Sequence, residues 1–348
     1  MKKAGQLGIS LGLTILIGYV VYIGVPDWHH AWHVMIQGKP LWLFAGFFFV
    51  MVHMLLRALR WGILLSAIKQ GISLKNLFSL TLVKYVVNVI PPRAGEVASS
   101  VVLARKEKIS VASVIAASLL ERILDMVTVV LIFGFYLSFY AYRFPPNSDR
   151  GREIMALIQK YSLKGFVVLC LAFWLLAFLL KKDGWLSRLP HGPQNLLRSF
   201  LGGFKGLQQG GVVLKAMVLS FAIWISVTFQ LLSMMHAYLE TFPFAGVVFL
   251  MVITVVGVAI PTPGGVGGFQ FFMNLGLVNF FSQYLSKIDP VSQAAGISNG
   301  CYLVSMVPVM LIGLIFLNRE GLSFSRLASM KKEAEVRDPK ILDSVSEP

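Results

Sequence analysis

The sequence predicts an all-α fold, a polytopic bundle of helices embedded in a membrane. Apolar residues make up 56% of the 348 residues and charged residues only 14%, and the mean hydropathy is +0.74. Soluble globular domains carry about a quarter charged residues. The third observation is a series of apolar runs, several of which approach the roughly 20 residues that one bilayer crossing needs. The net charge of +15 lies in the short segments between these runs. We therefore expect attraction to lipid headgroups and no nucleic-acid partner.

The apolar runs give about eight membrane elements. They are Ala4–Val25, Leu41–Leu56, Val111–Tyr142, Leu163–Leu180, Val212–Tyr238, Phe244–Ile260, Phe269–Tyr284 and Val291–Leu317. The first run is too long for the apolar core of a signal peptide and predicts an uncleaved helix. The stretch Ser73–Ser100 is ambiguous, because it is apolar but interrupted, and Pro193–Gly211 has the spacing of an amphipathic helix on the membrane surface. These elements form one membrane-embedded domain, residues 1–320, followed by a polar tail, residues 321–348.

The distribution of Lys and Arg predicts the orientation of the chain. If the N-terminus is cytosolic, the cytosolic segments hold 23 of the 31 Lys and Arg residues and the opposite side holds 7, with Arg122 inside the membrane. Cytosolic loops of membrane proteins are enriched in these residues. We therefore expect a multi-pass protein of the cytoplasmic membrane with both termini in the cytosol.

Two segments cannot cross lipid as uninterrupted helices. The first reads Asn88-Val89-Ile90-Pro91-Pro92-Arg93-Ala94-Gly95-Glu96, and the second runs from Ala259 through Pro261, Pro263, Gly264, Gly265 and Gly267 to Gln270. Proline removes a backbone donor and glycine loosens the backbone, and such a break at membrane depth must be covered by protein or by water. We expect broken, re-entrant elements near residues 73–105 and 244–284. They would enter from opposite faces, as in an inverted repeat. The alternative is a pair of ordinary loops at helix ends.

A group of charged residues lies inside a predicted span. Glu121, Arg122 and Asp125 follow Ala116-Ala117-Ser118 in an apolar helix. Charges at this depth cost several kcal/mol unless they are paired or hydrated, and they usually mark function. Arg122 can pair with Asp125, three residues on. Glu121 needs another cation, for which the candidates are Arg93, Arg57 and Arg60. The alternative is an ion pair with a purely structural role.

A second polar group lies at the end of the run Leu41–Leu56 and directly after it. His53, Arg57 and Arg60 fall on nearly one helical face, next to Trp61. The rigid donor forks of two arginines suit a phosphate group. The alternative is that both arginines reach the headgroup layer from a helix end.

The motifs of several soluble protein classes are absent from the sequence. It has no phosphate-binding P-loop and no Cys or His cluster at zinc spacing, so we expect no cofactor and no metal site. Cys170 and Cys301 lie in apolar runs and define no disulfide framework.

Four motifs in order resemble one family. They are Arg57-Ala58-Leu59-Arg60-Trp61, Pro91-Pro92-Arg93-Ala94-Gly95-Glu96, Ser118-Leu119-Leu120-Glu121-Arg122-Ile123-Leu124-Asp125 and Pro261-Thr262-Pro263-Gly264-Gly265-Val266-Gly267. Over residues 5–320 the chain resembles the lysylphosphatidylglycerol synthase transmembrane region, a flippase-like membrane domain. The resemblance implies a protein that handles lipids but lacks the C-terminal aminoacyl-transfer domain of some members. Two departures concern Gln270, where the family usually has a carboxylate, and Ser298-Asn299-Gly300, where it often has an arginine.

The sequence therefore predicts a translocator (flippase) of an amphipathic lipid with a phosphate-containing headgroup, and no catalytic activity. The lipid would be a phospholipid, a polyprenyl-linked lipid or another amphipathic lipid, and a lipid-modifying enzyme is a further expected partner. The expected substrate-binding residues are Arg57, Arg60, Asn88, Arg93, Glu96, Glu121, Arg122, Asp125, Pro261, Pro263, Gly264, Gly265, Gly267 and Gln270. The alternatives are a non-transporting accessory subunit of a lipid or glycolipid pathway, and an intramembrane lipid-phosphate transferase or hydrolase with Glu121 or Asp125 as base.

Overall fold

The computed structural model describes residues 22–88, 94–139, 151–157, 211–260 and 262–319, together with 15–16, 18–19, 149 and 160. Within these ranges the chain is helical and contains no strand. Most of the expected first span, the span Leu163–Leu180, nearly all of the amphipathic segment Pro193–Gly211 and the tail from residue 321 lie outside the described residues. So do Pro91, Pro92, Arg93 and Pro261.

The described helices follow the chain in a simple order. They are α2 (Trp28–Ile36), α3 (Pro40–Leu65), α4 (Leu74–Val87), α5 (Ala94–Glu107), α6 (Val111–Phe139), α9 (Val212–Tyr238), α10 (Phe244–Ala259), η3 (Pro263–Gly265), α11 (Gly268–Phe280), η4 (Ser282–Tyr284) and α12 (Pro290–Arg319).

Three of these helices, α3, α9 and α12, are long and apolar enough to cross a membrane by length and composition. They contain 26, 27 and 30 residues. At 1.5 Å per residue each is about 40 Å long, which exceeds the roughly 30 Å hydrocarbon core of a bilayer. The shorter α10 is also apolar, and α6 reaches 29 residues although it carries the charged group expected from the sequence. The fold is that of a polytopic helical membrane protein.

The structure changes two expectations about helix boundaries. The second span does not end near Leu56 but continues to Leu65, so Arg57 and Arg60 lie inside α3. The apolar run in the sequence ends at the first charged residue. The helix continues beyond it because carboxylates of the neighbouring helix α6 pair with the charged side chains. The short helix α2 was not expected. Asp27 directly precedes it as the N-cap, and its side chain accepts a hydrogen bond from the His30 backbone N–H at 3.0 Å.

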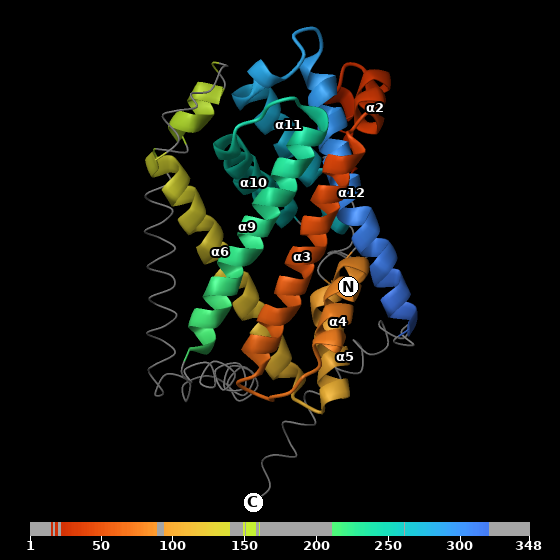
Figure 1. Cartoon of the computed structure of the whole chain (residues 1–348), viewed down its shortest axis with the longest axis vertical. Coiled ribbons are helices and arrows are strands. Elements are labelled where there is room, and N and C mark those ends of the chain that lie inside the picture. The colour runs from red at the N-terminus through yellow and green to blue at the C-terminus, as the bar shows by residue number, and fades with distance from the viewer. Residues whose placement is uncertain are drawn as a thin grey trace, which may run out of the picture.

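The described part of the ambiguous stretch Ser73–Ser100 lies in two helices. Helices α4 and α5 pack against each other, and we call this pair the first hairpin. Helices α10 and α11 pack in the same way, and with η3 they form the second hairpin. The two hairpins lie at opposite ends of the bundle (Figure 1).

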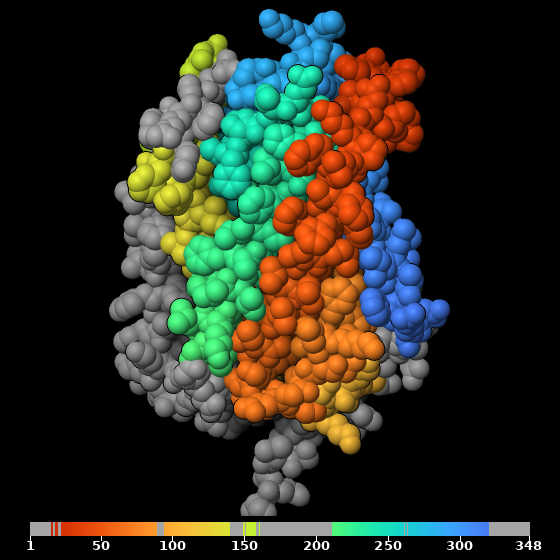
Figure 2. Space-filling view, viewed as in Figure 1, coloured from red at the N-terminus to blue at the C-terminus, as the bar shows by residue number. Residues whose placement is uncertain are grey.

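The long helices α3 and α9 lie side by side and run in opposite directions (Figure 1). The Ser226 hydroxyl donates to the Phe49 carbonyl oxygen at 3.1 Å, and the Phe49 and Phe229 rings stack with their centroids 5.5 Å apart. Figure 2 shows the two helices sharing one face of the molecule. Large apolar side chains such as Phe44 and Ile225 are exposed on these helices, as expected for a surface that faces lipid.

The buried apolar residues form two main clusters, and each surrounds one hairpin. Trp61, Leu80 and Leu103 belong to the cluster around the first hairpin. Phe249, Met273 and Met234 belong to the cluster around the second. Helix α12 connects the two ends. Its Gly296 lies against Ala31 of α2, and its Gly313 lies against Val86 of α4.

Candidate functional site

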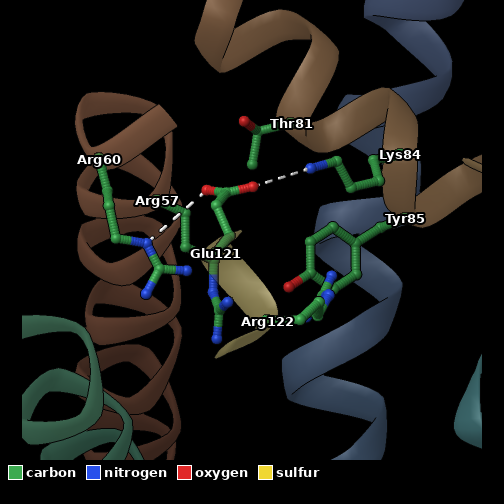
Figure 3. A pocket seen from close by; sticks show the side chains of 7 residues that line it. All are labelled: Arg57, Arg60, Thr81, Lys84, Tyr85, Glu121 and Arg122. Carbon is green, nitrogen blue, oxygen red and sulfur yellow. Dashed lines mark ion pairs between the residues drawn. The ribbon is translucent and has the colours of Figure 1, made fainter. Parts of the chain in front are cut away.

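A group of charged side chains lies between α3, α6 and the first hairpin (Figure 3). We call it the charged cluster, and its described members are Arg57, Arg60, Lys84, Glu96, Glu121, Arg122 and Asp125. Each comes from a helix whose other buried residues are mostly apolar or small. The cluster is therefore held by the packing of four helices.

Asp125 of α6 accepts hydrogen bonds from both arginines of α3. Its carboxylate accepts from Arg60 at 2.7 Å and from Arg57 at 3.3 Å. The two arginines are three residues apart and so lie on neighbouring positions of one helix face. Arg60 also donates to the Ser220 hydroxyl of α9 at 2.7 Å. The side chain of Arg60 is only 1% exposed. The alternative that both arginines extend from a helix end to the headgroups is wrong for Arg60, because protein surrounds it.

Glu121 lies between two cations. One carboxylate oxygen is 3.7 Å from Arg60 Nε, and the other is 3.5 Å from Lys84 Nζ. Lys84 also sits over the Trp61 ring at 4.6 Å, a cation–π arrangement. The partner predicted for Glu121 from the sequence was an arginine, and Lys84 was not among the candidates. A lysine in the apolar run Leu82-Val83-Lys84 was the signal available.

Arg122 and Glu96 form the outer pair of the cluster. Arg122 donates to the Glu96 carboxylate of α5, and its second nitrogen is 3.7 Å from Asp125. The Arg122 side chain is 47% exposed. The expected pairing of Arg122 with Asp125 is thus present, but the hydrogen bond goes to Glu96. This pair joins the first hairpin to α6.

The cluster contains more positive than negative groups. Its described members are four cations and three carboxylates. Among the described residues, no hydrogen-bond acceptor lies within reach of the buried donors Arg57 Nε, Arg60 Nε and Trp61 Nε1, although Arg60 Nε is 3.7 Å from the Glu121 carboxylate. Such groups are costly unless an acceptor reaches them. Both the charge and the free donors therefore favour an acceptor with negative charge.

A cavity of about 10 Å³ lies among Arg57, Arg60, Lys84, Glu121 and Arg122 (Figure 3). Thr81 and Tyr85 of α4 complete its lining. This volume is the space of roughly one water molecule. In the present arrangement the cavity cannot contain a phosphate group.

A second set of polar contacts crosses the bundle one helical turn away from Arg57. His53 Nε2 and the Gln230 side-chain oxygen are 2.9 Å apart, and the Gln230 amide donates to the Ser305 hydroxyl at 2.9 Å. These residues come from α3, α9 and α12. His53 is thus engaged with Gln230, and no described contact ties its side chain to the carboxylates of the charged cluster.

In the first hairpin, the break is closed by Asn88, whose side chain accepts from the Gly95 backbone N–H at 2.8 Å. A Cβ atom on Gly95 would collide with the Lys84 carbonyl, so the two helices cross in close backbone contact. Asn88 therefore has a capping role here. Of the residues expected in this break, Glu96 joins the charged cluster, and Arg93 lies outside the described residues.

The second hairpin is closed by Gln270, whose side chain accepts from the Gly267 backbone N–H at 2.8 Å. Gly264 and Gly267 have φ of 62° and 85°, a region that favours glycine. The Gly264 carbonyl accepts from the Tyr302 hydroxyl of α12 at 2.8 Å. Pro263 and Gly265 belong to the same turn. Gly264 and helix α11 contact α12, whereas the residues that line the charged cavity come from α3, α4 and α6.

Lys69 and Glu107 anchor the base of the first hairpin to the end of α3. Lys69 donates to the Glu107 carboxylate at 2.7 Å and to its backbone carbonyl at 2.9 Å. The hydrogen bond from Lys69 holds the pKa of Glu107 below its ordinary value, with help from Asn76. At neutral pH the anchor is therefore ionised and intact.

The fold and the cluster together define a class: a multi-pass helical membrane protein with a net-positive charged site inside its helical domain. The chain belongs to the lysylphosphatidylglycerol synthase TM region family, whose model matches residues 8–286. The match confirms the resemblance drawn from the four motifs, and it ends before α12. A search of curated proteins found no match.

Proposed function

We propose that this protein translocates an amphipathic lipid with a phosphate-containing headgroup across the cytoplasmic membrane. The observation that carries the proposal is the excess of positive charge in the buried cluster, combined with donors that lack acceptors. An intramembrane charge of this kind is costly and usually marks a substrate path. A lipid phosphate would supply the missing negative charge and the missing acceptor oxygens.

Arg57 and Arg60 suit this ligand because their guanidinium groups present several donors in a fixed plane. Lys84 and Arg122 would add charge on the opposite side of the cavity. Glu121 and Asp125 already bind these cations, so a phosphate would compete with carboxylates for the same donors. This competition lowers the affinity of the cations for the phosphate, so that the headgroup can bind and also be released.

The small cavity implies that the headgroup enters only when helices move apart. Two ion pairs join the first hairpin to α6, the partly exposed Arg122–Glu96 and the buried Lys84–Glu121. A phosphate bound to Lys84 would replace Glu121 as its partner, so that separation of the hairpin from α6 would not leave the buried cation unpaired. We expect the hairpin to separate from α6 during each transport cycle.

The order of elements supports an inverted repeat. A long helix, a hairpin and a second long helix occur as α3, α4–α5 and α6, and again as α9, α10–α11 and α12. The second set runs in the opposite direction, with its hairpin at the other end (Figure 1). Transporters with such repeats expose one central site alternately to the two sides of the membrane.

Lipid movement in reconstituted vesicles tests the proposal. Vesicles would contain phosphatidylglycerol labelled with a fluorophore on its acyl chain, and a membrane-impermeant reductant would quench the label in the outer leaflet. With the wild-type chain we expect the protected fraction to fall well below that of empty vesicles. Arg57→Gln should slow this movement about tenfold, since losing one charged contact costs roughly 1.4 kcal/mol or more.

The matched control is Arg152→Gln, the same substitution at an exposed residue paired with Asp149 outside the cluster. It should leave lipid movement unchanged. Movement no faster than in empty vesicles with the wild-type chain would contradict the translocator and favour an accessory role. Conversion of the labelled lipid into a new product would favour an intramembrane enzyme.

A further inference from the structure

The two proposed repeats can be placed in register through their helix ends. Leu65 is the last residue of α3, and Tyr238 is the last residue of α9. Aligning these two residues aligns Arg57 with Gln230. The same register, continued without a gap, places Lys84 on Gly257 and Gly95 on Gly268. Setting the last residue of α6 on that of α12 places Asp125 on Ser305 and Arg122 on Tyr302.

The contacts follow the same register, although they were not used to define it. Arg57 bonds to Asp125 at 3.3 Å in the first repeat, and Gln230 bonds to Ser305 at 2.9 Å in the second. Two helices of each repeat are thus joined at equivalent positions by a pair of side chains. One pair is ionic and the other is neutral.

The hairpins repeat this correspondence. Gly95 approaches the Lys84 carbonyl in the first hairpin, and Gly268 approaches the Gly257 carbonyl in the second, at equivalent positions. Arg122 reaches from α6 to Glu96 of the first hairpin, and Tyr302 reaches from α12 to Gly264 of the second. A chance similarity of helix lengths would not reproduce these contacts.

The register also shows that the charged cluster has no charged counterpart in the second repeat. The counterparts of the charged cluster are all uncharged: Gln230, Ser233, Gly257, Phe269, Cys301, Tyr302 and Ser305. Glu121, for example, corresponds to Cys301, which is fully buried. The two repeats share one architecture, and at these positions the first carries charged side chains and the second uncharged ones.

We infer that Gln230 and Ser305 form a second, uncharged half-site for the headgroup, the counterpart of Arg57 and Asp125, and that the chain holds one anionic lipid at a time. This inference rests on the proposed function. An amide and a hydroxyl can exchange hydrogen bonds with a passing headgroup but cannot retain its phosphate charge as the arginines do. The lipid would therefore be held at the charged pair of the first repeat and released past the neutral pair of the second.

Native mass spectrometry of the full chain in detergent, titrated with phosphatidylglycerol, tests this inference. The wild-type chain should bind one lipid tightly. The double variant Gln230→Arg/Ser305→Asp recreates the charged pair in the second repeat and should bind a second lipid, more weakly than the first because Ser233, Gly257 and Tyr302 supply no further cation. The reverse variant Arg57→Gln/Asp125→Ser places the neutral pair in the first repeat, and it should bind the lipid about tenfold more weakly because Arg60, Lys84 and Arg122 remain. Phosphatidylcholine, whose headgroup has no net charge, should not follow this pattern.

Thermal stability provides a readout that is independent of lipid. Ser305→Asp alone should lower the melting temperature, because it buries a carboxylate without a cation. Adding Gln230→Arg should restore most of the loss, since the register places the two side chains in contact. A double variant that remains as unstable as the single variant would overturn the equivalence of the two pairs.

The outcomes separate the two proposals. A wild-type chain that binds no phosphatidylglycerol would contradict the proposed function, and the half-site with it. A wild-type chain that binds one lipid, with a folded Gln230→Arg/Ser305→Asp variant that also binds only one, would overturn the half-site alone.

Discussion

At the scale of single residues, the ion pairs differ widely in how deeply they are held. Arg60 is 1% exposed and contacts two carboxylates, whereas Arg122 is 47% exposed. The sequence predicts that Arg122 lies inside the membrane and that the α3 arginines lie at a helix end. In the structure α3 continues past Arg60 and buries it against α6 and α9, whereas Arg122 lies nearer the protein surface.

Arg60→Ala should therefore destabilise the protein more than Arg122→Ala. Removing Arg60 leaves Asp125 and Glu121 short of a cation in a buried site, which typically costs about 3–5 kcal/mol. Removing Arg122 breaks a partly solvated pair, for which about 1 kcal/mol is typical. Thermal unfolding in detergent, followed by tryptophan fluorescence, compares the two variants. A lower melting temperature for Arg122→Ala would contradict the ranking.

Much of the charged cluster could be predicted from the sequence, since charged residues in apolar helices must find partners. Arg57, Arg60, Glu121 and Asp125 were expected together and lie together. Lys84 was not expected, because the interrupted stretch around it gave no helix face on which to place it. The positions of Asn88 and Gln270 in their hairpins were expected, but their capping bonds depend on turn geometry that residue types alone do not specify.

At the scale of elements, the two hairpins show what a short motif can and cannot predict. The prolines and glycines indicated two broken elements, and α4–α5 and α10–α11 are both hairpins. The dipeptides Ile90-Pro91 and Ile260-Pro261 match in sequence, but aligning them gives a register three residues away from the one that the close contacts of Gly95 and Gly268 follow. The packing of the backbones determines which residues of the two hairpins are equivalent, and a matching dipeptide does not report on packing.

The close approach inside the second hairpin predicts the effect of a single methyl group. Gly268→Ala should destabilise the protein by about 1–3 kcal/mol, because the new Cβ would collide with the Gly257 carbonyl. The matched control is Gly134→Ala in α6, where no atom lies within 4 Å of the new Cβ. There the higher helix propensity of alanine should stabilise the protein by up to about 1 kcal/mol. Equal melting temperatures for the two variants would contradict the close contact.

At the scale of the whole molecule, the first hairpin lies at one end of the bundle and the second at the other (Figure 1). The bias of 23 Lys and Arg residues against 7 predicts that the first-hairpin end faces the cytosol. Lys75, at the start of α4, and Ile288, which is 96% exposed in the loop before α12, mark the two ends.

Single cysteines at these two positions, in a chain with Cys170→Ser and Cys301→Ala, test the orientation. A membrane-impermeant maleimide added outside intact cells should label Ile288→Cys, and Lys75→Cys should react only after the cells are opened. The reason is the cytosolic enrichment of Lys and Arg, which places Lys75 inside. Labelling of Lys75→Cys in intact cells would reverse the assignment of the two hairpins.

The movement required for transport gives the last prediction. Ser100 of α5 and Ser118 of α6 are buried, and their hydroxyl oxygens are 3.4 Å apart. Cysteines at both positions should form a disulfide, which needs Cβ atoms about 3.5–4.5 Å apart. The bond would tie the first hairpin to α6 and keep the cavity at the size of about one water molecule. In the background without native cysteines, the oxidised double variant should move labelled phosphatidylglycerol no faster than empty vesicles do, and a reducing agent should restore movement. The single variants Ser100→Cys and Ser118→Cys should be active under both conditions. Full movement with the cross-link formed would show that the headgroup passes without separation of the hairpin from α6, and the path would then lie elsewhere in the bundle.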